Sequence, residues 1–302
     1  MVVMGYLVMC LVFGTTFLAI KIGIDAGTPP FLSAGLRFFT AGFILYGYML
    51  IRKKATLRFL FKKEMLITSI GLTFGTFATL YWAEQFVSSG TAAVLSATGP
   101  MMILLIQRLI LKVNIHFLAF VGCIVGVAGV FLLILPSVNF QVETQWLWGC
   151  LLIVAGQGFY ASGAVYSKMV SGRFEVISPI TLNAAQMMHG GILLLLLSVF
   201  TEKASFEGAF SLAEIGSLVY LIVIGSMVGH SLFYWLMTKT DPVFPATWLF
   251  ISPIIAVILG MVLYQESLTW VSGQGVLVIM LGTVMVQVPF LARRSGAVAR
   301  KG

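Results

Sequence analysis

Apolar segments about 20 residues long follow one another along nearly the whole chain, and this limits its fold more than any other feature. Hydrophobic residues make up 60% of the chain and charged residues only 9%, whereas a soluble domain carries roughly 25% charged residues. In hydrocarbon every main-chain donor and acceptor needs an internal partner, so only helices and closed barrels span a membrane. The segments have helical length, because barrel strands are only about 10 residues long. The sequence therefore predicts an all-α integral membrane protein.

Ten of these segments are predicted to cross the membrane, and short polar or turn-forming stretches connect them. The predicted spans are 3–24, 30–51, 65–84, 89–111, 115–135, 146–168, 178–200, 212–236, 243–263 and 270–290.

Basic residues are distributed unevenly between the two sets of connections. If the N-terminus lies in the cytoplasm, the connections and tail on that side hold fifteen lysine and arginine residues, and the opposite connections hold only Lys203. Cytoplasmic loops of membrane proteins carry an excess of Lys and Arg. We therefore expect both termini to be cytoplasmic, with a short basic tail at the C-terminal end. The net charge of +8 then reflects orientation and does not predict a nucleic-acid partner.

A repeated aromatic pair indicates that the chain is an internal duplication. Tyr81 and Trp82 recur as Tyr234 and Trp235, 153 residues later. The same offset pairs Ala93 with Ala246, Pro100 with Pro253, Gly122 with Gly275, and Gly129 with Gly282. The aromatic pairs are typical of side chains at a membrane interface, or they form mirror-related gates around a central cavity.

The duplication predicts two five-helix repeats, covering residues 1–139 and 145–302. With a slightly different offset Pro30 falls on Pro179, and each proline opens the second helix of its repeat. An odd number of crossings makes the second copy enter the membrane from the opposite side. The expected architecture is therefore ten transmembrane helices in two inverted repeats, with any substrate site between them.

The stretches "FGTTFLAIKIGIDAGTPPFLSAGLRFFTAGFIL", "SSGTAAVLSATGPMMILL" and "PATWLFISPIIAVILGMVLYQESLTWVSGQGVLVIMLGTVM" resemble the EamA type of the drug/metabolite transporter superfamily. The resemblance covers nearly the whole chain and implies ten helices in two inverted halves. It also implies movement of small metabolites, often outward, across a bacterial inner membrane. The chain departs from the family pattern at Phe13, where Trp is usual before Gly14. A glutamate usual before the fifth helix is kept as Glu266 but is replaced by Val113 in the first repeat.

Among the charged residues within predicted spans or at their ends, three are candidates for a functional role, because charge there is costly and often functional. Lys21 lies near the end of the first span and Arg37 well inside the second, while Glu84 ends the third. Lys21 could instead extend to the headgroups, and Arg37 could form a structural pair within the bundle. We expect Glu84 to contact Lys21 or Arg37, as a gating or ion-pair element.

The resemblance implies a cavity lined by helices 1, 3, 4, 6, 8 and 9. The matching candidates for substrate binding are Thr15, Thr16, Trp82, Ser96, Gln157, Tyr160, His230, Tyr234 and Trp248. Each hydroxyl could instead form an interhelical hydrogen bond, worth about 0.6 kcal/mol on average. His230 could likewise bond to a neighbouring helix, and no other ligand lies at metal-binding spacing from it.

The sequence favours a secondary transporter over an enzyme. It has no glycine loop followed by Lys and Ser or Thr to bind a nucleotide, and we expect no cofactor or metal. The expected cargo is an amino acid, a nucleobase or a small amphipathic metabolite, moved by an ion gradient, by exchange or by facilitated diffusion. The alternatives are a lipid- or prenyl-processing membrane enzyme and a non-transporting scaffold, and the sequence also leaves a homodimer open.

Overall fold

Helices make up the whole secondary structure of the part of the chain that can be described. The computed structural model describes residues 1–135, 144–174, 177–202, 211–264 and 269–299, and no strand occurs within these ranges. The helices before residue 136 are α1 (Val2–Asp25), α2 (Pro30–Ile51), α3 (Leu57–Leu60), α4 (Lys63–Ser69), η1 (Ile70–Gly75), α5 (Thr76–Ala83), α6 (Ser89–Ser96), α7 (Gly99–Leu111) and α8 (Phe117–Ile134). Those after residue 143 are α9 (Thr144–Arg173), α10 (Pro179–Thr201), α11 (Leu212–Tyr220), η3 (Leu221–His230), α12 (Ser231–Lys239), α13 (Val243–Ala246), α14 (Trp248–Tyr264) and α15 (Trp270–Ala299).

The helices have the lengths and compositions of a multi-pass membrane protein, as the sequence predicted. Seven helical stretches among the described residues are long and apolar enough to cross a membrane. Three shorter apolar helices cover Phe117–Leu133, Val243–Ile255 and Gly273–Pro289. The all-α membrane class is thus confirmed, while the number of ten crossings remains a prediction.

Two helices begin where the local sequence supplies their first turn. Pro30 and Pro179 occupy the start of α2 and α10, where the missing N–H is not needed and φ is already helical. Ser178 also caps α10 by accepting a hydrogen bond from the Ile180 amide at 3.3 Å. In α11 Ser211 and Glu214 form a reciprocal capping box, which satisfies two otherwise unpaired donors.

Four of the expected spans are not regular α-helices. The stretch 63–83 contains the π-helical segment η1, and the stretch 212–239 contains η3. The expected spans 89–111 and 243–263 each divide in two, as α6 with α7 and α13 with α14. Pro100 lies in the first turn of α7. Proline is tolerated there because the amide hydrogens of a first helical turn have no acceptor within the helix.

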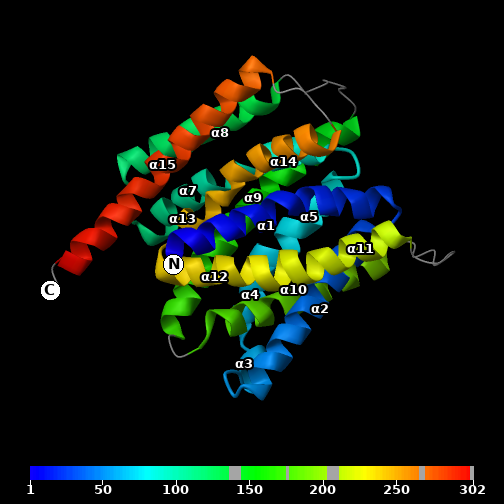
Figure 1. Ribbon diagram of the computed structural model, residues 1–302. Coiled ribbons are helices and arrows are strands. Elements are labelled where there is room, and N and C mark those ends of the chain that lie inside the picture. The colour runs from blue at the N-terminus through cyan, green and yellow to red at the C-terminus, as the bar shows by residue number, and fades with distance from the viewer. Residues whose placement is uncertain (136–143, 175–176, 203–210, 265–268, 300–302) are drawn as a thin grey trace.

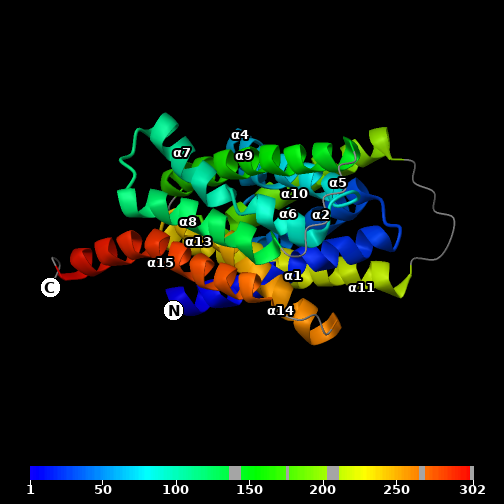
Figure 2. The ribbon, with the colours of Figure 1, turned by 90° about the horizontal axis from the view of Figure 1, so that it is seen from above.

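Several of the helices pack as antiparallel pairs (Figures 1 and 2). α15 lies along α8 in both views, and glycines bring their backbones together. A Cβ on Gly122 would lie 2.9 Å from the Gly282 carbonyl oxygen, and one on Gly275 would lie 2.9 Å from that of Gly129. Close backbone approach through small residues is typical of helix pairs in membranes.

α1 runs antiparallel to α11, η3 and α12, from the end of the bundle at which the N-terminus lies (Figure 1). A Cβ on Gly5, near the start of α1, would lie 2.8 Å from the Trp235 ring in α12. Near the other end of α1, the Ser217 hydroxyl of α11 donates to the Ala19 carbonyl oxygen at 2.5 Å. The two ends of the bundle are called here the N-terminal end and the opposite end.

Candidate functional site

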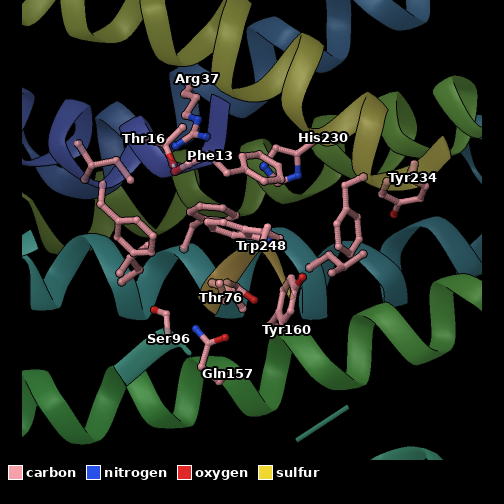
Figure 3. Close-up of a pocket in the computed structure, with 17 residues that line it drawn as sticks. Phe13, Thr16, Arg37, Thr76, Ser96, Gln157, Tyr160, His230, Tyr234 and Trp248 are labelled. Carbon is pink, nitrogen blue, oxygen red and sulfur yellow. Dashed lines mark hydrogen bonds between the residues drawn. The ribbon is translucent and has the colours of Figure 1, made fainter. Parts of the chain in front are cut away.

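A small cavity lies among α1, α2, η1, α5, α6, α9, η3, α12 and α14 (Figure 3). Its volume is 40 Å³, which is room for about three water molecules. Sites for small organic ligands measure about 300–1,000 Å³. A metabolite can therefore enter only if the surrounding helices move apart.

Seven predicted substrate-binding residues line this cavity. They are Thr16, Ser96, Gln157, Tyr160, His230, Tyr234 and Trp248. Figure 3 shows Trp248 near the middle of the group, with Ser96 and Gln157 on the side away from Arg37. The side chains come from helices far apart in the sequence, so the tertiary fold brings them together.

Two predicted residues, Thr15 and Trp82, are not among those lining the cavity. Thr15 is one residue from Thr16, and this turns its side chain by about 100° around the helix. Its hydroxyl hydrogen-bonds the Tyr220 hydroxyl and donates to the Val12 carbonyl oxygen. The Trp82 ring packs against Phe86, with the ring centroids 5.0 Å apart. Both residues lie on the expected helices but on a different face.

The polar atoms around the cavity have few partners. The Ser96 hydroxyl and His230 Nε2 are buried without a hydrogen-bond partner among the described residues. The Tyr160 hydroxyl lies beside Trp248 and the Tyr234 hydroxyl beside Ser167, but neither pair reaches hydrogen-bond geometry. Leaving a buried donor or acceptor unpaired costs about 1–3 kcal/mol each. Native proteins rarely tolerate such groups without a functional reason or a bound water. The cavity therefore offers several unpaired polar groups to a ligand.

Aromatic rings form much of the remaining wall, and the sequence analysis did not single them out as site residues. The Phe13 ring lies 4.5 Å from the Trp248 ring and 5.1 Å from the His230 ring, measured between centroids. Phe13, Thr16, Phe17 and Ile20 all line the cavity, and their spacing marks one face of a helix. This helical spacing could have identified the cavity-facing side of α1 from the sequence. The lining residues Thr76, Phe77 and Phe233 were also missed.

Arg37 lines the cavity and is only 1% exposed. Its Nε donates to the Ser226 hydroxyl at 2.8 Å and its Nη1 to the Tyr81 hydroxyl at 3.1 Å. The guanidinium carbon lies 4.6 Å from the centre of the Phe38 ring and 5.2 Å from that of the Phe77 ring. Neutral hydroxyls and aromatic faces therefore hold this permanent positive charge.

Lys21 links α1 to the end of α5 at the opposite end of the bundle. Its Nζ donates to the main-chain carbonyl oxygen of Glu84 at 3.0 Å and forms an ion pair with Asp25 at 2.8 Å. Lys21 and Glu84 are thus in contact as expected, but through the backbone and not as the expected ion pair. The i,i+4 spacing on α1 brings Asp25 beside Lys21. The fully buried carboxylate of Glu84 has no hydrogen-bond partner among the described residues.

Lys168 makes a comparable link at the N-terminal end. Its Nζ donates to the carbonyl oxygens of Met237 and Thr240 at 2.7 and 2.9 Å, at the end of α12. Cations are favourable at helix C-termini because carbonyl groups there lack helical partners. The sequence analysis did not propose Lys168 as a site residue. A shift of 147 residues aligns it with Lys21, and that alignment could have identified it.

The same end is also closed by a group of polar contacts. The Tyr6 hydroxyl lies 2.8 Å from the Thr247 hydroxyl, to which Gln287 Nε2 also donates at 2.9 Å. The Tyr6 ring packs against Phe244, with the centroids 5.4 Å apart. Among the residues that the structure describes, no cluster of three His, Cys, Asp or Glu side chains could hold a metal ion.

The family and the relatives that this chain resembles are described as transporters. The sequence profile of the EamA-like transporter family matches residues 1–135 and 147–288. The chain is 28% identical over 278 residues to the "Uncharacterized inner membrane transporter YedA" of Escherichia coli, covering 91% of this chain and 87% of that protein. It is 26% identical over 295 residues to the "Uncharacterized transporter YoaV" of Bacillus subtilis, covering 97% and 99%. A crystal structure described only as that of a protein superposes with a TM-score of 0.77 at 18% identity, covering 96% of this chain and 98% of that one.

Proposed function

Because the chain belongs to the EamA-like transporter family, we propose that it is a secondary transporter that moves small metabolites by alternating access through the central cavity. The central cavity is the main observation that supports this proposal. It combines unpaired polar groups with aromatic walls, and contacts between helices close the bundle on both sides of it. A site that is closed toward both ends and too small for a metabolite is expected between the two open states of a transporter.

We further propose that the chain consists of two inverted five-helix repeats, residues 1–139 and 145–302, with ten crossings in total. The contacts between α8 and α15 support this arrangement. Under the offset of 153 residues, Gly122 corresponds to Gly275 and Gly129 to Gly282. The contact of Gly122 with Gly282 therefore becomes that of Gly275 with Gly129 when the halves are exchanged, and both are 2.9 Å approaches. Such reciprocity is the signature of a two-fold axis between the partners.

The contacts between α2 and α10 have the same reciprocal form. The offset of 149 residues, taken from Pro30 and Pro179, relates Gly42 to Gly191 and Phe39 to Met188. A Cβ on Gly42 would lie 2.7 Å from the Met188 amide nitrogen, and one on Gly191 would lie 2.7 Å from the Phe39 Cα. The α8–α15 pair and the α2–α10 pair thus support the same two-fold axis.

The two lysines supply equivalent gates in this proposal. Lys21 binds the carbonyl oxygen of Glu84, and Lys168 binds that of Met237, which is 153 residues after Glu84. Each lysine joins the first helix of its repeat to the C-terminal end of the third. The two links lie at opposite ends of the bundle, so breaking one at a time would expose the cavity to one compartment at a time.

The proposed cargo is an amino acid, a nucleobase or a small amphipathic compound, moved outward across a bacterial inner membrane, with both termini in the cytoplasm. The aromatic and largely neutral lining supports such molecules over sugars or metal ions. The family match and the names of the relatives point to transport and not to an enzyme. A homodimer remains compatible with the proposal.

Counterflow in proteoliposomes tests the proposal. Candidate substrates come from comparing metabolites secreted by cells with and without the protein, and the purified protein should exchange at least one of them across liposomes. Replacing Trp248, which lines the cavity, by alanine should abolish exchange. The matched control is Trp148→Ala, because Trp148 is 57% exposed on the outside of the bundle. Equal loss of exchange in both variants, or no exchange of any secreted compound, would argue against this site.

A further inference from the structure

The charge of Arg37 narrows the class of substrate. We propose that Arg37 binds the carboxylate of the substrate, so that the preferred cargo is a small organic anion with a flat apolar body. This inference rests on the proposed transport function and adds a preference for anions that neither the family match nor the relatives' names contain.

The charge of Arg37 has no acidic partner within salt-bridge distance among the described residues. A cation within a membrane helix costs roughly 2.5–3.5 kcal/mol even when the site adapts to it. In the described parts of the chain no ion pair is found for Arg37, whereas Lys21 pairs with Asp25. The buried carboxylate of Glu84 forms neither an ion pair nor a hydrogen bond with Arg37. An anionic ligand would supply the missing partner.

Two of the three guanidinium nitrogens of Arg37 are held by hydroxyl groups. Nε and Nη1 are engaged by Ser226 and Tyr81, and Nη2 donates to no acceptor among the described residues. Figure 3 shows the guanidinium beside Thr16 at the edge of the cavity. Arginine N–H groups commonly bind carboxylates, and the contacts with Ser226 and Tyr81 leave the N–H groups of Nη2 for such a ligand.

Gly225 provides the space for this arrangement. A Cβ at residue 225 would lie 3.1 Å from Arg37 Nη2 and 3.2 Å from Thr16 Cγ2. Such contacts are tight, so the guanidinium or Thr16 would have to shift by a few tenths of an ångström to admit a side chain there. The glycine in η3 therefore keeps Nη2 beside the cavity.

The residue that corresponds to Arg37 in the other half of the chain is uncharged. The offset of 149 residues relates Arg37 to Gln186. Gln186 is fully buried, accepts a hydrogen bond from the Thr73 hydroxyl at 2.6 Å and donates to Asn183 Oδ1 at 3.2 Å. In the second half of the chain a neutral side chain thus fills the position that Arg37 fills in the first half. Packing alone therefore does not require a charge at this position.

The aromatic wall defines the rest of the ligand. The rings of Phe13, Phe77 and Trp248 line the same cavity as Arg37. Flat apolar groups pack well against such rings in offset or edge-on geometry. The matching ligand has a carboxylate at one end and an aromatic or other planar body at the other.

Ligand binding to the detergent-purified protein tests this assignment without requiring transport. The probes are three carboxylates with their neutral amides: benzoate and benzamide, phenylacetate and phenylacetamide, hydrocinnamate and hydrocinnamide. In the wild-type protein at least one carboxylate should bind roughly ten-fold more tightly than its amide, as measured by ligand-dependent thermal shift. Arg37→Gln, which installs the side chain of the other half, should remove this preference and leave amide binding in place.

A second variant covers the case in which Arg37→Gln does not fold. Gly225→Ala keeps the charge but crowds Nη2, and it should weaken carboxylate binding without weakening amide binding. The proposal is overturned if no carboxylate binds the wild-type protein, if carboxylates and amides bind equally, or if the preference survives in Arg37→Gln. If the preference is present but counterflow fails for every compound, the transport function fails and the assignment of Arg37 stands. If counterflow succeeds without a preference for carboxylates, the transport function stands and the assignment of Arg37 fails.

Discussion

Replacing Lys168 by methionine should open the N-terminal end of the cavity. Methionine keeps the apolar stem but cannot donate to the carbonyl oxygens of Met237 and Thr240, which Lys168 Nζ contacts at 2.7 and 2.9 Å. A charged hydrogen bond contributes about 1.5–3 kcal/mol in a buried site. Because Lys168 is only half-buried, we assign about 1 kcal/mol to each bond after solvent screening. The loss of about 2 kcal/mol corresponds to a roughly thirty-fold shift toward the state open at that end.

Chemical labelling of the cavity measures this shift. A cysteine replaces Ser96, which lines the cavity, in a protein whose three native cysteines are changed to alanine. A membrane-impermeant maleimide is then applied to intact cells and to inside-out vesicles. Lys168→Met should increase labelling in inside-out vesicles, where the N-terminal end is expected to face the reagent.

Lys21→Met is the matched variant, because Lys21 makes the corresponding link at the opposite end. It should increase labelling in intact cells instead. If both variants raise labelling from the same side, or if neither changes it by more than two-fold, the lysine contacts are not gates and the reasoning fails.

Two further predictions concern the packing and the threading of the chain. Gly282→Val should lower the free energy of unfolding by about 1–3 kcal/mol through overpacking, since a Cβ there would lie 2.6 Å from the Gly126 Cα. Gly47→Ala, with no atom within 4 Å of the added Cβ, should change it little in the same denaturation assay. Cysteines introduced separately at Asn139 and Lys301 should be labelled from opposite sides of the membrane. Labelling of both from one side would exclude two inverted five-helix repeats.

The helices were largely predictable because a membrane span depends only on a run of consecutive residues along the chain. A membrane span needs about 20 consecutive apolar residues, so their positions can be read directly from the sequence. The ends were less predictable. α9 and α15 extend to Arg173 and Ala299, several residues past the predicted ends, because a helix can continue in water once the apolar segment is over. The π-helical segments left no signal in hydropathy.

The candidate site was predictable by helix but not always by face. Thr16 lines the cavity and Thr15 does not, although both are threonines on the same turn. Which of them faces inward depends on the rotation of α1 against α11 and η3, and that rotation is set by side-chain packing. Alignment with Lys21 under a shift of 147 residues marks Lys168 itself, but its acceptors could not be predicted, because they are main-chain carbonyl oxygens that every residue possesses.

By itself, the sequence determined that this protein is a helical membrane protein, the approximate limits of its helices and its family, because those properties follow from composition, apolar length and motif. Only the tertiary structure decided which polar side chains share one cavity and how small that cavity is. It alone placed Arg37 at the cavity wall with neutral hydrogen-bond partners. These features depend on contacts between residues more than two hundred positions apart, such as Phe13 and Trp248, and such contacts form only when the helices pack together.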